Sequence, residues 1–204
     1  MKKIQHTLQD LAELRTGYPF RERLEADPGG NVRVIQLKDL SERNIVDFSG
    51  AVRIYMPEYS KTHSLHKGDL VFRSRGYITT AALMTEDADD VILAAPFFRI
   101  RIHNPSVVLP EYLNWYISSR PAQRYFTARQ TGTSVNMVAA PELAALPVPV
   151  PPAAVQQRIA DIAALAEKQN LLETELMQKQ KTYIEELLLE QAYREENQEE
   201  NIHE

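Results

Sequence analysis

The sequence predicts an α+β fold in which a mostly antiparallel β domain with short helices is followed by one long C-terminal coiled-coil helix. Within the first 152 residues, short runs of β-branched and aromatic residues alternate with turn sequences, as is typical of strands. Five prolines lie between Pro141 and Pro152, which excludes a long helix there and favours an extended edge segment. No proline or glycine follows Pro152, so a long helix is expected from that point onward.

The β-rich part begins with a short helical turn within residues 8–14 that leads into a strand ending at Thr16-Gly17. Asp27-Pro28-Gly29-Gly30-Asn31 is a turn sequence, because glycine and asparagine accept positive φ angles. Further strands are predicted at residues 32–37, within 45–55, at 70–72 with a hairpin partner in 77–83, at 91–95 and at 97–102. In residues 97–102, Phe98, Ile100 and Ile102 alternate with Arg99 and Arg101, which predicts a strand with one solvated face.

Two short helices are expected after these strands. Pro110 and Pro121 occupy favoured first-turn positions of helices running to Ile117 and through residues 123–128. We interpret the apolar and aromatic side chains of these helices as core residues that pack on the sheet rather than as surfaces that stack on bases: Leu113, Trp115, Tyr116, Tyr125 and Phe126.

The long helix carries an apolar stripe with three- and four-residue spacing, which is typical of a helix that packs against a partner helix. Gln169 and Lys179 interrupt the stripe with polar residues that can select register. Because the chain has no second long helix, we expect another chain to cover the stripe. The predicted dimerisation residues are Ile162, Leu165, Leu172, Leu176, Tyr183 and Leu187.

Charge is divided unevenly between the two parts. Residues 1–152 carry 18 Lys and Arg, mostly Arg, against 16 Asp and Glu, whereas residues 153–204 carry 5 against 12. An arginine-rich part favours DNA binding, because one guanidinium can bond two acceptors of a guanine or a phosphate. The same arginines could instead solvate a surface. The absence of cysteine excludes disulfides and fits a cytoplasmic location, and no apolar run approaches the ~18 residues of a membrane span.

The most informative basic element is Arg73-Ser74-Arg75-Gly76. If the strand persists, its two arginines point to the same side, and Gly76 allows close backbone approach to a ligand. The alternative is that one arginine pairs with a carboxylate such as Asp69 and orders the turn. We expect DNA contacts from the aromatic-basic loop near the N-terminus, from this element and from the polar loop before the prolines: Tyr18, Arg21, Arg23, Arg73, Arg75, Arg129, Thr131, Thr133, Ser134 and Asn136.

Catalytic and metal-binding motifs are missing from the sequence. His63-x-x-His66 has no third ligand at a diagnostic spacing, and no glycine-rich nucleotide loop is present. Asn104-Pro105-Ser106 lacks the second proline and the aromatic residue that an adenine methyltransferase uses. We therefore expect no catalytic residue, metal or cofactor in this chain.

Three segments, taken in order, resemble the DNA specificity subunits of type I restriction-modification systems. They are Thr16-Gly17-Tyr18-Pro19-Phe20-Arg21, the segment from Lys67 to Gly76, and TGTSVNMV followed by LPVPVPP and a Gln-Gln-Arg-Ile helix start. The resemblance implies a DNA target-recognition domain at 1–152, a spacer and dimerisation helix at 153–196 and a disordered acidic tail at 197–204. It also implies double-stranded DNA, a methyltransferase subunit and a restriction subunit as partners, with S-adenosylmethionine and ATP/Mg²⁺ on those subunits.

Family members typically carry two recognition domains and two spacer helices, whereas this sequence has one of each and no internal repeat. A homodimer through antiparallel helices would restore that layout and read two identical inverted half-sites. The alternative from a different functional class is a coiled-coil adaptor that binds protein and has no DNA specificity.

Overall fold

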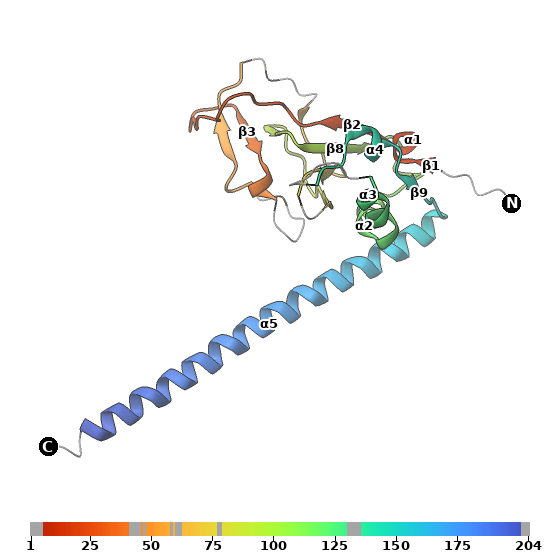
Figure 1. Ribbon diagram of the computed structural model, residues 1–204. Helices are drawn as coiled ribbons and strands as arrows, with labels where there is room; N and C mark the ends of the chain where they lie inside the picture. Colours follow the sequence, from red (N-terminus) through yellow and green to blue (C-terminus); the bar gives the residue numbers. More distant parts are fainter. Residues whose placement is uncertain are drawn as a thin grey trace. The chain divides into compact units, whose positions relative to one another are not determined.

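The computed structural model describes residues 6–40, 46, 48–57, 59, 63–76, 79–129 and 136–200, with side chains as far as residue 193. The chain divides into two compact units, Met1–Ala160 and Asp161–Glu204. Figure 1 shows strands and short helices in the first unit and a single helix in the second. The predicted α+β class, with mainly antiparallel strands and a long C-terminal helix, is confirmed.

A four-stranded antiparallel sheet forms the centre of the first unit. Its strand order is β2 (Ala12–Thr16), β8 (Phe97–Ile102), β5 (Leu70–Arg73) and β6 (Ala81–Leu83). The sequence predicted each of these strands. Strand β6 is the shorter second arm of the expected hairpin, and the part of that arm at residues 77–78 lies outside the described residues.

Two smaller sheets complete the β structure. In the first, β3 (Val32–Ile35) lies between antiparallel β4 (Val52–Ile54) and parallel β7 (Val91–Leu93). In the second, β1 (His6–Thr7) pairs with β9 (Pro147–Val148), so the proline-rich segment does form an edge strand. Strand β4 is much shorter than the region predicted for it.

The helices of the first unit begin at the residue types that favour helix starts. α1 (Leu8–Leu11), the 3₁₀ turn η1 (Leu37–Asp39), α2 (Pro110–Ser118), α3 (Arg120–Thr127) and α4 (Ala140–Ala144) follow in chain order. Proline lies in the first turn of α2, α3 and α4, where its missing N–H costs no helical hydrogen bond. Helix α4 corrects the prediction for the proline block, which becomes extended only from Pro147.

Side chains pack on both faces of the four-stranded sheet. On one face Phe72 and Ile100 pack with Leu113 and Phe126 of α2 and α3. On the other face Val71 and Phe97 belong to a second core. The prediction of β8 as a half-buried strand is therefore wrong at Arg99, which is only 3 % exposed, whereas Arg101 is partly exposed. Trp115, predicted as core, is also corrected: it lies 38 % exposed on the outer side of α2.

The long helix α5 (Ala153–Glu200) begins directly after the last proline of the block. Its first two turns belong to the first compact unit, where Gln156 and Ala160 are buried. From Asp161 the helix forms the second unit and continues to Glu200, so part of the range predicted as a disordered tail is helical. Residues 201–204 lie outside the described residues.

Gln156 hydrogen-bonds the start of α5 to the rest of the first unit. Its carbonyl accepts the Leu109 N–H at 2.9 Å, and its amide donates to the carbonyls of Val107 at 2.9 Å and Pro151 at 2.8 Å. The side chain is 1 % exposed, so water cannot replace these bonds without opening the junction.

Replacing Gln156 with alanine therefore leaves buried polar backbone groups unsatisfied. We expect Gln156→Ala to lower the free energy of unfolding by about 2–3 kcal/mol. Gln178→Ala, an exposed glutamine of the same helix, should change it by less than about 0.5 kcal/mol. Chemical denaturation of the two variants measures both values, and equal values would contradict the role of Gln156.

Candidate nucleic-acid interface

The loops that carry the predicted DNA contacts leave the four-stranded sheet at the same end. Thr16 pairs with Phe98, and Arg73 pairs with Phe97, so β2 and β5 end where β8 begins. Because β8 lies between them, the two loop starts are two strand spacings apart, roughly 10 Å. That separation is comparable with the ~12 Å width of the DNA major groove.

The loop after β2 is bonded to the backbone that precedes β8. The Gly17 N–H donates to the Phe97 carbonyl at 2.8 Å, and the Tyr18 N–H donates to the Leu93 carbonyl at 2.6 Å. Ala95 N–H donates back to the Tyr18 carbonyl at 3.0 Å. These bonds hold Tyr18, which packs its ring against Phe20 with centroids 4.8 Å apart.

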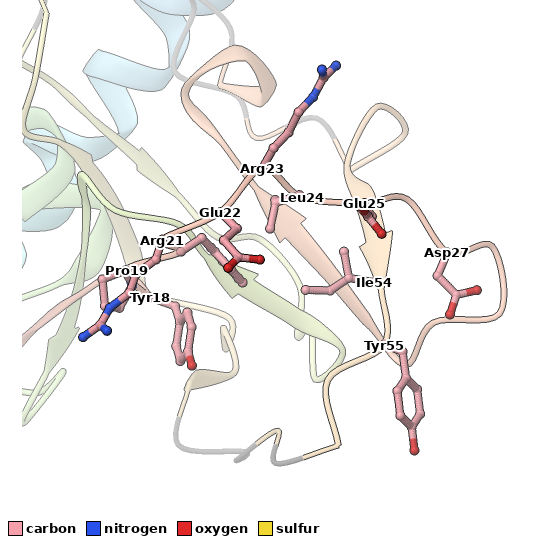
Figure 2. A pocket seen from close by; sticks show the side chains of 11 residues that line it. Tyr18, Pro19, Arg21, Glu22, Arg23, Leu24, Glu25, Asp27, Ile54 and Tyr55 are labelled. Atoms are coloured by element: carbon pink, nitrogen blue, oxygen red, sulfur yellow. The ribbon is translucent and has the colours of Figure 1, made fainter.

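Beyond Tyr18 the chain lines an open cavity of about 820 Å³ formed by residues 18–25 with Asp27, Ile54 and Tyr55. Figure 2 shows the guanidinium groups of Arg21 and Arg23 directed to different sides of this segment. Both side chains are exposed. The cavity wall therefore presents two arginines, three carboxylates and aromatic rings on a solvent-facing stretch of chain.

The Arg73–Gly76 element separates its two arginines. Strand β5 ends at Arg73, which is half-buried and donates from Nη2 to the Leu40 carbonyl at 2.6 Å. Ser74 is buried, and its hydroxyl donates to the Pro96 carbonyl. Arg75 is exposed. The strand does not persist to Arg75, so the condition for the two arginines to point the same way is not met.

Residues 136–138 lie beside this element although they are distant in sequence. Gly76 N–H donates to the Asn136 carbonyl at 3.0 Å, and Val138 N–H donates to the Ser74 carbonyl at 2.8 Å. Arg75 and Met137 form an antiparallel bridge, and Gly76 has a φ angle of +122°, which glycine adopts readily. The structure thus brings exposed Asn136 next to exposed Arg75.

Arg129 lies within the described residues, whereas most of the polar loop that follows it does not. The Arg129 guanidinium lies 4.0 Å from the centre of the Tyr125 ring and 3.4 Å from a Glu142 carboxylate oxygen. It is exposed but already has partners within the protein. Thr131, Thr133 and Ser134 lie outside the described residues.

Comparison with known proteins identifies the family of the chain. Residues 3–185 match the family model described as the type I restriction modification DNA specificity domain. The chain belongs to this family.

Solved structures of specificity subunits share the fold of this specificity domain. The S subunit of a type I restriction-modification system from M. genitalium is 16 % identical, with a TM-score of 0.54, over 83 % of this chain and 40 % of its own. The HsdS subunit from Thermoanaerobacter tengcongensis is 20 % identical, with a TM-score of 0.58, over 82 % and 43 %.

A third similar chain comes from a study of complex assembly and conformational transition of the type I R-M system. It is 20 % identical, with a TM-score of 0.62, over 83 % of this chain and 43 % of its own. The specificity domain described here therefore spans about two fifths of the length of these structures. A search of the curated proteins gives no match.

The opposite end of the sheet in this specificity domain is acidic. Glu86 and Asp87 are exposed in the loop after β6, and Asp87 accepts the Lys67 N–H at 2.9 Å. Asp69, 2 % exposed, receives two bonds of 2.6 and 2.7 Å from Arg101. The alternative that Asp69 pairs with Arg73 or Arg75 is thus corrected, because its partner comes from β8.

Arg99 and Arg101 play a structural part that the sequence did not reveal. Arg99 donates to Glu13 at 2.8 Å, and both arginines donate to the Ser64 carbonyl. Burial, followed by the nearby Arg101 charge, lowers the pKa of Arg99, whereas hydrogen bonding to Asp69 raises the pKa of Arg101. Their alternation in sequence is the same as in a strand with one exposed face, so only the packing around them shows that Arg99 is buried and that Arg101 is partly buried.

His63 lies beside the loop after β2, with its ring 6.0 Å from the Tyr18 ring in an edge-on arrangement. Burial, and then the charges of Arg15 and Arg99, lower its pKa, which favours the neutral imidazole. His66 instead bonds the Ser64 hydroxyl at 3.0 Å. Within the described ranges no group of three His, Asp or Glu side chains is placed to hold a metal ion. None of the described helices is both long and apolar enough to cross a membrane.

Gly17 provides a test of the attachment between the loop after β2 and the sheet. A Cβ atom at Gly17 would lie 2.6 Å from the Ala94 carbonyl carbon and oxygen, so the loop must move to admit it. We expect Gly17→Ala to lower the free energy of unfolding by about 1–3 kcal/mol and to weaken DNA binding. Gly50→Ala, whose Cβ would lie 3.7 Å from an Asp39 oxygen, is the matched control. Thermal unfolding and duplex binding measure both effects, and a stable Gly17→Ala variant would refute the tight attachment.

Proposed function

We propose that this chain is the sequence-reading part of a type I restriction-modification system and that each chain reads one half of a split DNA target. The observation that carries the proposal is the gathering of three separate segments at one end of the sheet of a DNA specificity domain. These segments are the loop from Tyr18 to Arg23, the Ser74–Gly76 turn and Asn136–Met137. The loop roots lie on a rigid sheet, which suits readout of base edges by loop side chains.

The exposed arginines of this surface are assigned to DNA contact. Arg21, Arg23 and Arg75 are exposed. Arg75 lies in the bridge to Met137, and Arg21 and Arg23 follow Tyr18, whose N–H is bonded to the Leu93 carbonyl. Arg73 would support the turn through its bond to the Leu40 carbonyl and approach DNA with the rest of its guanidinium. Thr131, Thr133, Ser134, Arg129 and Tyr18 complete the proposed contact set.

We further propose that α5 pairs with the same helix of a second chain, in antiparallel orientation. Six apolar stripe residues are between 41 % and 68 % exposed within the described chain: Ile162, Leu165, Leu172, Leu176, Tyr183 and Leu187. An apolar stripe of this kind is stable in water when another helix covers it. Antiparallel pairing puts the two recognition domains at opposite ends of the helix pair, as two inverted half-sites require.

The proposed partners follow from the family. A methyltransferase subunit and a restriction subunit would assemble on this chain in the cytoplasm and carry S-adenosylmethionine and ATP/Mg²⁺, while this chain contributes no catalytic group. The alternative function, an adaptor that binds only protein, is supported by a single observation, the exposed stripe. The salt dependence of DNA affinity separates the two functions, because DNA binding through phosphates weakens steeply as salt rises.

The proposed function is tested by sequencing the methylated bases of the genome in cells with the gene, without it, and with Arg75→Ala. We expect an inverted-repeat motif to be methylated only when the gene is present. If Arg75 reads a guanine, its loss should cost roughly 1–3 kcal/mol at one base pair and relax the motif there. An unchanged set of methylated sites after deletion would contradict the proposal.

The helix pairing is tested by Leu172→Glu with Leu176→Glu. Placing two carboxylates in the stripe should give a soluble monomer, and its affinity for a duplex with both half-sites should fall about 100-fold or more because avidity is lost. Thr174→Glu with Gln178→Glu adds the same charge on the opposite side of the helix and should leave the dimer intact. Sedimentation and duplex titration measure both properties, and a wild-type chain that stays monomeric with its methyltransferase would disprove the pairing.

A further inference from the structure

Helix α3 carries a basic face that is separate from the loops discussed above. Arg120, Arg124 and Thr127 are spaced at i, i+4 and i+7, which places them on one side of a helix. Ala122 and Phe126, on the other side, are fully buried in the main core. With Gln123 and Ala128, the exposed residues line a shallow hollow of about 390 Å³.

The two arginines of this face lack the carboxylate partners that other arginines have. Arg33 and Arg53 bond Asp90, and Arg129 lies beside Glu142. Within the described part of the chain, no hydrogen bond or ion pair involves the guanidinium groups of Arg120 and Arg124, and both side chains are exposed.

The position of Arg120 on α3 adds to the positive potential of this face. It occupies the first turn, where the helix dipole is equivalent to a partial positive charge, and the first turn contains no acidic residue. A cation at this end is unfavourable for an isolated helix. An anion bound there would be favoured by both arginines and by the helix dipole.

Direct hydrogen bonds join α3 to the hairpin that presents Arg75. The Gln123 amide donates to the Thr79 carbonyl at 2.7 Å, and Thr79 lies in the connection between β5 and β6, as Arg75 does. Because Gln123 also bonds the Ile117 carbonyl at 2.8 Å, its position between α2 and the hairpin is fixed. Gln123, which also lines the hollow with Arg120 and Arg124, therefore attaches this part of α3 to the hairpin that carries Arg75.

We propose that Arg120 and Arg124 bind phosphates of the DNA backbone next to the bases that the loops read. This inference rests on the proposed DNA-reading function and adds a second contact of a different kind. Two guanidinium groups one helical turn apart on a rigid helix bind sequence-independent anions and set the register of the duplex. They are positioning residues, and an acidic protein surface is the competing occupant.

Counterion release gives the expected size of the effect. Each phosphate contact contributes about 0.9 to the negative slope of log affinity against log salt, so removing two contacts should reduce its magnitude by about 1.8. At 0.15 M salt the same relation predicts a loss of about 30-fold in affinity for any duplex. The base sequence preferred at each position should not change.

The experiment measures duplex binding by the full chain from 0.05 to 0.5 M salt, using a mixed-sequence duplex and the methylated target. Arg120→Gln with Arg124→Gln should lower the slope by about 1.8 on both duplexes. Arg120→Lys with Arg124→Lys should restore most of the slope, because it keeps both charges. Lys168→Gln with Lys181→Gln, which removes two exposed charges of α5 that lie outside the apolar stripe, should leave the slope unchanged. Thermal unfolding confirms that all variants are folded.

Three results would overturn the inference in distinguishable ways. A wild-type chain that shows no salt-dependent DNA binding would refute the proposed function itself. A double Gln variant with the wild-type slope would refute only the phosphate contact. The same unchanged slope together with reduced self-association or methyltransferase binding would assign the basic face to an acidic protein surface.

Discussion

Hydrogen bonds to backbone carbonyls of residues 93–97, where β7 connects to β8, hold the proposed DNA-reading surface together. The Gly17 and Tyr18 N–H groups donate to Phe97 and Leu93, and the Ser74 hydroxyl donates to Pro96. Two loops that are more than fifty residues apart in sequence are thereby attached to one short segment. Loops with mobile roots would lose affinity to the entropy of ordering on DNA, so attachment to the sheet end favours the base contacts that we propose for their arginines.

Charge differs between the two ends of the four-stranded sheet. Arg21 and Arg75 lie in the loops that follow β2 and β5, whereas Glu86 and Asp87 occupy the opposite end. Some arginines add little to the positive potential of the surface because a carboxylate of the same chain pairs with them, as Asp69 does with Arg101. A chain of net charge −5 can therefore present a basic surface to DNA.

Local signals in the sequence predicted most of the fold. Strand β8 was placed at its observed boundaries, and proline in the first turn marked α2 and α3, because these features depend on neighbouring residues only. Burial of Arg99 and exposure of Trp115 depend on what packs from distant segments, which no local pattern encodes. The pairing of Arg101 with Asp69 was missed for the same reason, since the nearer arginines were the only candidates that spacing suggested.

The candidate site was predictable only in part. Glycine and arginine in short loops identified Tyr18–Arg23 and Arg73–Gly76 as segments, but their common location follows from the register of β2, β8 and β5. Nothing in the sequence signalled that Asn136 lies beside Gly76, or that Gln123 of α3 bonds the hairpin. Arg120 and Arg124 carried a visible i, i+4 spacing, but a basic helix face acquires meaning only when its neighbours are known.

Amide hydrogen exchange of the full chain with and without its methylated target duplex measures directly whether the three loops contact DNA. We expect slower exchange on DNA binding in residues 18–25, 74–76 and 136–138, where the loops meet at one end of the sheet. Residues 84–90 and 103–107, at the other end, should exchange at the same rate in both states. Protection confined to that opposite end, or absent from all three loops, would contradict the account.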